Sequence, residues 1–243
     1  MNEASTLWSI ILPCFNEAGN LALLVEEIAS ALAGARKSFE ILIIDDGSDD
    51  ATVQVTAELS RRDPRVRGIR HVRNLGQSAA LATGFALSKA PLVATLDGDG
   101  QNDPGDLVRM LEELERTGAD AICGVRARRR DSIVRRASSR IANAFRNFVT
   151  GDHVRDSGSG IRVVRREALA EIPVFSGMHR FLPTLLRLQG FRVVEVEVAH
   201  RPRRSGVSKY GIGNRLWRGI LDCLVVRWYR KRAIPSRRHR IFP

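Results

Sequence analysis

Three carboxylates and a glutamine amide follow an apolar run within LVATLDGDGQNDP, residues 92–104: Asp97, Asp99, Gln101 and Asp103. Carboxylates this close together repel one another, so another interaction must offset the repulsion. A bound metal cation, a phosphate ligand held through a metal, or solvent exposure on a loop would each do so. Oxygen donors of this kind suit Mg²⁺ or Mn²⁺. A D-x-D pair by itself does not choose among the three.

The spacing excludes a calcium loop of the EF-hand type. Such a loop carries a glutamate at its twelfth position. Counted from Asp97, that position is Val108, and Pro104 would break the loop. Gly98 and Gly100 instead suit a tight turn at a strand end, where two carboxylates can share one hard cation.

The elements around this cluster alternate between strand and helix. We expect strands at 8–15, 39–48, 66–72, 91–97, 119–126 and 191–203, and helices at 20–35, 50–63, 76–90 and 104–118. This alternation predicts an α/β fold with a mainly parallel central sheet and flanking helices. Ligands of such sheets bind at the C-terminal strand ends. Asp45, Asp46, Asp97 and Asp99 follow such ends, so they can converge in space.

The bulk properties indicate a globular protein. The chain has 243 residues, of which 44% are hydrophobic, enough for one sizeable domain. Its three cysteines are far apart and form no C-x-x-C pair, which argues against disulfides and zinc and favours a reducing compartment. We expect no signal peptide, and no apolar run approaches transmembrane length. A soluble or peripheral protein is therefore expected.

The net charge of +12 is unevenly distributed. Residues 126–167 hold twelve arginines against four acidic residues, and residues 201–240 hold thirteen basic residues against Asp222 alone. The rest of the chain has 14 basic and 22 acidic residues, a net charge of −8. Nucleic acid, anionic lipid or phosphate would suit the basic part, and a solvated basic face is the simpler interpretation.

Five motif-like segments follow one another along the chain: LPCFNEAGNL, IIDDGSDDAT, NLGQSAALATGF, TLDGDGQNDP and DSGSGIRVVRREAL. Together they resemble the inverting glycosyltransferases of family 2 over about residues 8 to 232. Within that family the set is most similar to the polyprenyl-phosphate glycosyltransferases typified by dolichyl-phosphate mannose synthase. The resemblance implies the GT-A fold, a Rossmann-like nucleotide-diphospho-sugar transferase fold.

The resemblance also assigns roles to individual residues. It implies nucleotide binding by Pro13, Asn16, Glu17, Asp46, Gly76, Ser78 and Asp97. It implies a Mg²⁺ or Mn²⁺ site at Asp97, Asp99 and Gln101. It implies an acceptor-phosphate site at Arg126, Arg140, Arg162, Arg203 and Lys209, with Asn143 beside Arg140. Asp99, Arg126, Arg203 and Lys209 are the residues expected to act in catalysis. Asn16, Gly76 and Ser78 also fit ordinary turn and helix-cap residues.

The implied reaction is an inverting, metal-dependent transfer of a hexose from a nucleotide sugar to a polyprenyl phosphate, dolichyl or undecaprenyl. GDP-mannose is the first expectation for the donor, with a UDP-sugar as the alternative. A phosphate acceptor needs no catalytic base, because the second pKa of a phosphate monoester is near ~6. It needs cations that bring two anions together, and the Arg-rich second half fits that requirement.

The domain hypothesis places a GT-A catalytic domain at residues 1–204, with an Arg-rich helical acceptor-side segment at 126–165. Residues 205–243 would form a mobile basic loop and an amphipathic C-terminal helix in peripheral membrane contact. The helical stretches 132–149 and 215–232 could lie at an anionic membrane surface or pack on the core. The expected location is the cytoplasmic face of a membrane, reached directly or through a membrane partner protein.

Two other functions compete with this one. A family 2 enzyme acting on a saccharide, lipid or protein hydroxyl would need a catalytic base, and Asp156 is the nearby candidate. A nucleic-acid-binding protein would use the basic charge, but it should interleave stacking aromatics. Aromatic residues make up 6% of the chain and no nucleic-acid-binding motif occurs. We therefore expect no nucleic-acid partner.

Overall fold

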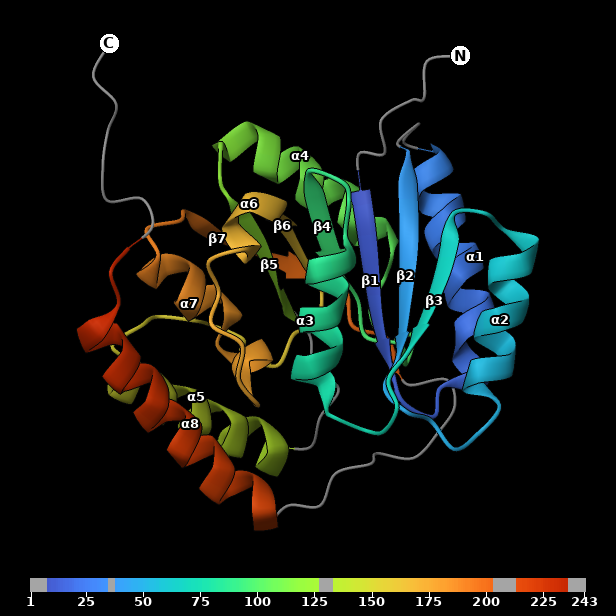
Figure 1. Ribbon diagram of the computed structural model, residues 1–243. Helices are drawn as coiled ribbons and strands as arrows, with labels where there is room; N and C mark the ends of the chain where they lie inside the picture. Colours follow the sequence, from blue (N-terminus) through green and yellow to red (C-terminus); the bar gives the residue numbers. More distant parts are fainter. Residues whose placement is uncertain (1–7, 35–37, 127–132, 203–212, 236–243) are drawn as a thin grey trace.

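A seven-stranded sheet forms the centre of the molecule, with helices on both faces (Figure 1). The computed structural model describes residues 8–34, 38–126, 133–202 and 213–235, with side chains described except at 34, 133–140 and 213–218. The strands are β1 (Trp8–Cys14), β2 (Phe39–Asp45), β3 (Val66–Arg70), β4 (Leu92–Thr95), β5 (Ala121–Arg126), β6 (Arg162–Arg165) and β7 (Val193–Val198). The helices are α1 (Ala18–Gly34), α2 (Thr52–Arg62), α3 (Gln77–Leu87), α4 (Gly105–Thr117), α5 (Ile133–Thr150), α6 (Arg166–Leu169), η1 (Met178–Arg180), α7 (Leu182–Leu188) and α8 (Gly213–Arg232).

The strand order is β3-β2-β1-β4-β6-β5-β7. β1 pairs in parallel with β2 and β4, β2 with β3, and β5 with β7. β6 runs antiparallel to both of its neighbours. The expectation of a mainly parallel α/β sheet is confirmed. Because β1 to β4 are parallel, the loops that follow them emerge at one edge of the sheet.

Two apolar layers hold the helices against the sheet. Along β1, Ile10 and Leu12 belong to the layer with α1 and α4, whereas Ile11 belongs to the layer with α3 and α7. This alternation is the period of two that a strand imposes on its side chains. Each fully buried Leu or Ile contributes about 1.5–3 kcal/mol relative to exposure. The two layers thus fix the strand ends that carry the site.

One strand departs from the sequence-based expectation. We expected helical segments around a Gly/Ser turn after residue 126, but residues 162–165 form β6 between β4 and β5. Its Val163 and Val164 are buried on opposite faces of the sheet. Four residues are too few for a periodic signal, and their ladder partners lie some forty and seventy residues earlier. The short helix α6 follows β6 without a loop, so the sequence of the strand and the helix together resembles one helical segment.

The expected helices in the basic half are confirmed as α5 and α8, which lie side by side at the end toward which β1 and β2 point (Figure 1). Their C-terminal turns meet where Arg230 Nη1 donates to the Thr150 carbonyl at 3.1 Å. α8 packs on the core through Cys223 and Val226. The sequence left open whether the apolar residues of 215–232 pack on the core. Leu221, Leu224 and Trp228 face outward, Ile220 is half-buried, and the Trp217 side chain lies outside the described part.

Candidate active site

The loops after β1 and β2 are joined to each other at the C-terminal edge of the sheet. The Asn16 amide donates to Ser48 Oγ at 2.9 Å, and the Asn16 side chain accepts from the Asp49 amide at 3.0 Å. The Glu17 amide donates to Thr52 Oγ1 at 2.9 Å. Asn16 has a φ of +55°, a left-handed conformation that asparagine tolerates better than most residues. These residues shape the loop beside Pro13, so Asn16 is a turn residue here, and its contact with a nucleotide stays a prediction.

Asp46 anchors the loop before α3. Its Oδ1 accepts from the Leu75 amide at 2.9 Å, and its Oδ2 accepts from the Gly76 amide at 2.7 Å. His71 Nδ1 lies 2.7 Å from Asp46 Oδ1. Gly76 has a φ of +93°, which favours glycine. The structure therefore brings the predicted residues Asp46 and Gly76 together, and contact of Asp46 with a nucleotide base stays a prediction.

Ser78 and Gln77, at the start of α3, have different partners. Ser78 Oγ lies 2.8 Å from His179 Nδ1 and accepts from the Gly177 amide at 3.0 Å, so this hydroxyl holds the loop before η1. Gln77 instead donates from Nε2 to Asp97 Oδ1 at 2.9 Å. Sequence reasoning named Ser78 and passed over Gln77, which is the residue of the two that reaches the acidic cluster.

Asp97 and Asp99 occupy the turn after β4. The Asp97 amide donates to Asn102 Oδ1 at 3.2 Å, and the Gln101 amide donates to Asp99 Oδ1 at 3.1 Å. A Cβ atom placed on Gly160 would lie 2.2 Å from Asp97 Oδ2, so the carboxylate fills the space that this glycine leaves open. The turn therefore holds both carboxylates in defined positions.

The Asp97 carboxyl resists ionisation. Burial, together with the charge of Asp99, raises the pKa of Asp97 to about 6, although Arg162, Arg126 and the Gln77 hydrogen bond act against the shift. Asp99 is buried. A cation bound between the two carboxylates would relieve both the burial and the repulsion.

Two arginines stand opposite the acidic pair. Arg126, at the end of β5, donates from Nε and Nη2 to the two carboxylate oxygens of Asp156 at 2.8 and 2.9 Å. Arg162, at the start of β6, is buried and donates from Nη2 to the His179 carbonyl at 3.0 Å. The turn at 156–160 links them, because a Cβ atom on Gly158 would lie 2.6 Å from Arg126 Nη2. Both arginines are close enough to Asp97 for their charges to act on its carboxylate.

The remaining predicted acceptor-side residues are described only in part. Arg203 and Lys209 lie outside the described residues, and the Arg140 side chain does as well. Asn143 is described, and its Oδ1 accepts from Ser157 Oγ at 3.0 Å. α5 is thereby joined to the turn at 156–160, which lies between Arg126 and Asp97.

Sequence reasoning missed Gln77, Gly158 and Gly160 as parts of this site. The run SGSG at 157–160 did signal a turn. What it contacts depends on β6, which brings residues 160–162 beside Thr95, where Thr95 Oγ1 donates to the Gly160 carbonyl at 2.6 Å. Without the antiparallel strand, the sequence offers no reason to place this turn against Asp97.

The site offers few protein side chains as ligands for a metal ion. Within the described part of the chain, no group of three or more His, Cys, Asp and Glu side chains lies close enough to hold one ion. Asp97, Asp99 and Gln101 offer oxygen atoms, which suit Mg²⁺ or Mn²⁺ when water and phosphate oxygens complete the shell. A cation would relieve the mutual repulsion of the two carboxylates, so these residues fit such an ion.

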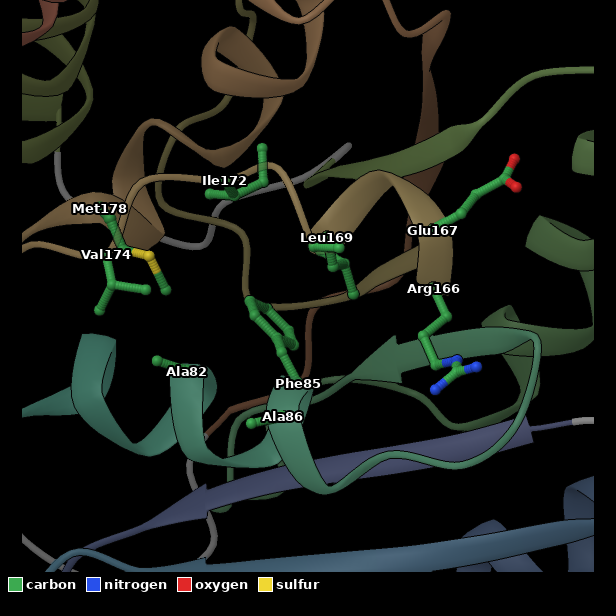
Figure 2. Close-up of a pocket in the computed structure, with 10 residues that line it drawn as sticks. Ala82, Phe85, Ala86, Arg166, Glu167, Leu169, Ile172, Val174 and Met178 are labelled. Carbon is green, nitrogen blue, oxygen red and sulfur yellow. The ribbon is translucent and has the colours of Figure 1, made fainter. Parts of the chain in front are cut away.

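A cavity of about 500 Å³ lies elsewhere, between α3 and the segment 166–178 (Figure 2). Its lining is mostly apolar, with Phe85 and Leu169 facing the hollow and Arg166 and Glu167 at one end. None of the predicted site residues lines it. The chemistry of the acidic pair therefore belongs to the strand ends and not to this cavity.

The fold is that of the GT-A glycosyltransferases. The sequence model of glycosyl transferase family 2 matches residues 9–173, and the chain belongs to that family. A dodecaprenyl-phosphate galacturonate synthase of Rhizobium johnstonii is 36% identical over 233 residues, which cover 94% of this chain and 69% of the relative. An undecaprenyl-phosphate 4-deoxy-4-formamido-L-arabinose transferase of Aeromonas hydrophila is 32% identical, covering 87% of this chain and 65% of the relative.

Solved structures agree on the fold. Glucosyl-3-phosphoglycerate synthase from Mycobacterium tuberculosis, in complex with Mn²⁺, UDP-glucose and phosphoglyceric acid, superposes with a TM-score of 0.68. The match covers 96% of this chain and 83% of that one at 18% identity. Across the described residues, no helix combines the length and the apolar character needed to span a bilayer.

Proposed function

We propose that the chain transfers a sugar from a nucleotide sugar to the phosphate of a polyprenyl phosphate, with inversion at the sugar. The observation that carries the proposal is the pairing of an acidic couple, the half-buried Asp97 and the buried Asp99, with the arginines Arg126 and Arg162 across one turn. Both relatives are named for polyprenyl-phosphate acceptors. Since the chain spans 65–69% of their lengths, the activity of the whole protein is part of the proposal.

The donor half of the proposed site is the acidic turn. Asp97, Asp99 and Gln101 would hold Mg²⁺ or Mn²⁺, which would neutralise charge on the departing nucleotide diphosphate as a Lewis acid. Pro13, Asn16, Glu17, Asp46 and Gly76 line the neighbouring strand ends and are proposed to bind the nucleotide. Gln77 holds Asp97 in place through its amide.

The acceptor half is the arginine side. Arg126 and Arg162 would attract the lipid phosphate, with Arg140, Arg203 and Lys209 as further proposed contacts. Preorganised cations of this kind stabilise charge in the transition state without reorganising. Asp156, the candidate base for a hydroxyl acceptor, is engaged with Arg126 through both oxygens. That engagement favours an acceptor that needs no base, because a phosphate monoester is already largely ionised at neutral pH.

The relatives shift the expectation for the donor. Their names specify galacturonate and 4-deoxy-4-formamido-L-arabinose and give no support to mannose. We therefore place UDP-sugars ahead of GDP-mannose as the proposed donor.

An exposed apolar face supports the membrane part of the proposal. It consists of Ile141, Phe145 and Phe148 on α5 and Leu221, Leu224, Val225 and Trp228 on α8. We call it the α5–α8 face. On α5 the usual arrangement is reversed: Phe148 is 82% exposed, whereas Arg146 is 5% exposed. Arg146 donates to the Val154 carbonyl at 3.1 Å.

We propose that the α5–α8 face rests on an anionic membrane surface. Arg227, Arg230, Lys231 and Arg232 flank it on α8, and basic helices with exposed aromatic and aliphatic residues bind such surfaces. α5 contacts the site turn through Asn143. A membrane at this face would therefore present the lipid phosphate close to the arginines.

The test of the function is direct transfer to lipid. Metal-stripped protein is incubated with Mn²⁺, a panel of UDP- and GDP-sugars and a short polyprenyl phosphate, and sugar in the organic extract is measured. Asp99→Asn is run beside Glu113→Gln, a surface carboxylate on α4 that pairs with Arg116. We expect labelling from one donor, lost with Asp99→Asn and kept with Glu113→Gln. Nucleotide binding without lipid labelling would redirect the search to hydroxyl acceptors.

A further inference from the structure

The residues after β7 run back along the acidic turn. The Ala199 amide donates to Asp106 Oδ2 at 2.7 Å, and His200 forms an antiparallel bridge with Asn102. The Arg201 amide donates to the Gln101 carbonyl at 2.9 Å, and Gln101 Nε2 donates to the Arg201 carbonyl at 3.3 Å. Residues 199–201 thus form a backbone strap over the segment that follows Asp99.

The Arg201 side chain ties this strap to two further elements. Its Nη2 lies 2.7 Å from Asp103 Oδ2, and its Nη1 donates to Glu27 Oε2 on α1 at 3.0 Å. One guanidinium therefore connects three segments that are about 75 and 100 residues apart in the chain. The third carboxylate of the opening cluster, Asp103, is thereby engaged in an ion pair.

The strap acts on the atoms that orient the acidic pair. Gln101, which Arg201 holds, donates its amide to Asp99 Oδ1 at 3.1 Å. Asn102, which His200 holds, accepts from the Asp97 amide at 3.2 Å. A change of the Arg201 side chain leaves these backbone hydrogen bonds in place, but it removes the anchor of Asp103 in the segment 101–103 that orients both carboxylates. It would also release the charge of Asp103 next to them.

We propose that Arg201 is a positioning residue for cation binding by Asp97 and Asp99, which deepens the proposed function and rests on it. A cation site whose ligands are already fixed binds without the loss of freedom that an unanchored loop would suffer. Residues that orient metal ligands typically change metal affinity by about 10- to 100-fold when removed. No contact between Arg201 and the substrate is needed for this role.

The test is a Mn²⁺ titration of the full chain, with and without UDP, followed by the electron paramagnetic resonance of free Mn²⁺. Arg201→Gln is compared with wild type, and Arg116→Gln serves as the control because it breaks an exposed arginine–carboxylate pair on α4. We expect Arg201→Gln to weaken Mn²⁺ binding about tenfold and Arg116→Gln to leave it unchanged. Circular dichroism confirms that each variant is folded in the same buffer.

Two further variants guard against a folding defect. Asp103→Asn should weaken Mn²⁺ binding as Arg201→Gln does, and the double variant should be no worse than either, because both remove the same ion pair. Arg201→Lys keeps the charge but lacks the fork that reaches two carboxylates, so it should fall between wild type and Arg201→Gln. A folded Arg201→Gln or Asp103→Asn protein whose Mn²⁺ affinity stays within twofold of wild type overturns the inference.

The same titration separates this inference from the proposed function. Wild-type protein that binds Mn²⁺ yet transfers no sugar to lipid would refute the function and leave the role of Arg201 decided by its variants. Wild-type protein that binds no Mn²⁺ even with UDP would refute the cation site, and the role of Arg201 with it.

Discussion

Asp97 is a carboxyl group whose environment disfavours its charge. Its pKa is raised to about 6 by burial and by Asp99, above the ordinary value of 3.8. The folded protein therefore binds more protons than the unfolded chain between pH 4 and 6. Stability contributed by this group falls as the pH rises through that window and stays low above it. The acidic pair thus keeps strain in the free protein that a cation would remove.

Replacing Asp97 with asparagine should remove this strain. In EDTA at pH 7.5 we expect Asp97→Asn to be more stable than wild type by up to about 3 kcal/mol, the equivalent of a shift of about two pKa units. The gain should shrink as the pH falls through 6 toward 4, because the wild-type carboxyl then becomes neutral. Urea unfolding at pH 7.5, 6 and 4.5 measures it, and a gain that is independent of pH would contradict the assignment.

Arg126 and Asp156 offer a second prediction at this scale. We expect Arg126→Gln to lower transfer about 100- to 1,000-fold, as for loss of a preorganised charge at a reacting centre. Asp156→Asn should lower it less, by about tenfold, because it only releases the arginine. The pH–rate profile of Asp156→Asn should keep its acidic limb, since Asp156 is not the base. Initial rates from pH 5 to 9 test this, and a larger loss for Asp156→Asn would restore the hydroxyl-acceptor alternative.

At the scale of elements, the site depends on how β6 enters the sheet. β6 pairs with β4 and β5, and it places the turn 156–160 between Arg126 and Asp97. Glycine is required at 160 because a Cβ atom there would meet the Asp97 carboxylate. The separation between the acidic and the basic side is therefore set by one short strand and one turn.

Adding a methyl group at Gly160 should disturb this arrangement. We expect Gly160→Ala to destabilise the fold by about 1–3 kcal/mol, as overpacking does, and to weaken Mn²⁺ binding. Gly219→Ala on α8 is the matched control, because its Cβ would meet nothing within 4 Å and alanine favours a helix by up to about 1 kcal/mol. Thermal unfolding and Mn²⁺ titration of both variants give the answer. If the two variants have the same unfolding temperature and the same Mn²⁺ affinity, the Asp97 side chain can move away from the added methyl group.

At the scale of the whole molecule, positive charge and exposed apolar side chains are concentrated on the second half of the chain. The α5–α8 face carries Phe148 and Trp228, which are 82% and 63% exposed. A polar underside on α5 and a basic C-terminal turn on α8 accompany it. Exposing such a patch to water is unfavourable, and patches of this kind on soluble domains commonly mark a membrane or protein contact.

Charges placed on this face should release the protein from membranes. We expect Phe148→Glu with Trp228→Glu to lower the fraction that floats with vesicles of phosphatidylcholine and phosphatidylglycerol about fivefold. Val72→Glu is the control, because Val72 is 99% exposed and lies outside this face. Added salt should weaken wild-type binding through the basic residues. Flotation that is equal in all three proteins would remove the membrane from the proposal.

Local residue patterns determined most of the fold. Apolar runs, helical spacing and strand-end aspartates predicted the parallel strands, most helices and the acidic turn, because each signal lies within about fifteen residues of chain. Tertiary structure alone decided β6, the approach of Gly160 to Asp97, the pairing of Arg126 with Asp156, and the strap of Arg201 over the acidic turn. These contacts join segments 30 to 170 residues apart, and their energies depend on distance in space, which a linear pattern does not contain. For the same reason the sequence predicted a helix at 132–149 but left open which side of it faces the core, and only the tertiary structure buries Arg146 and exposes Phe148.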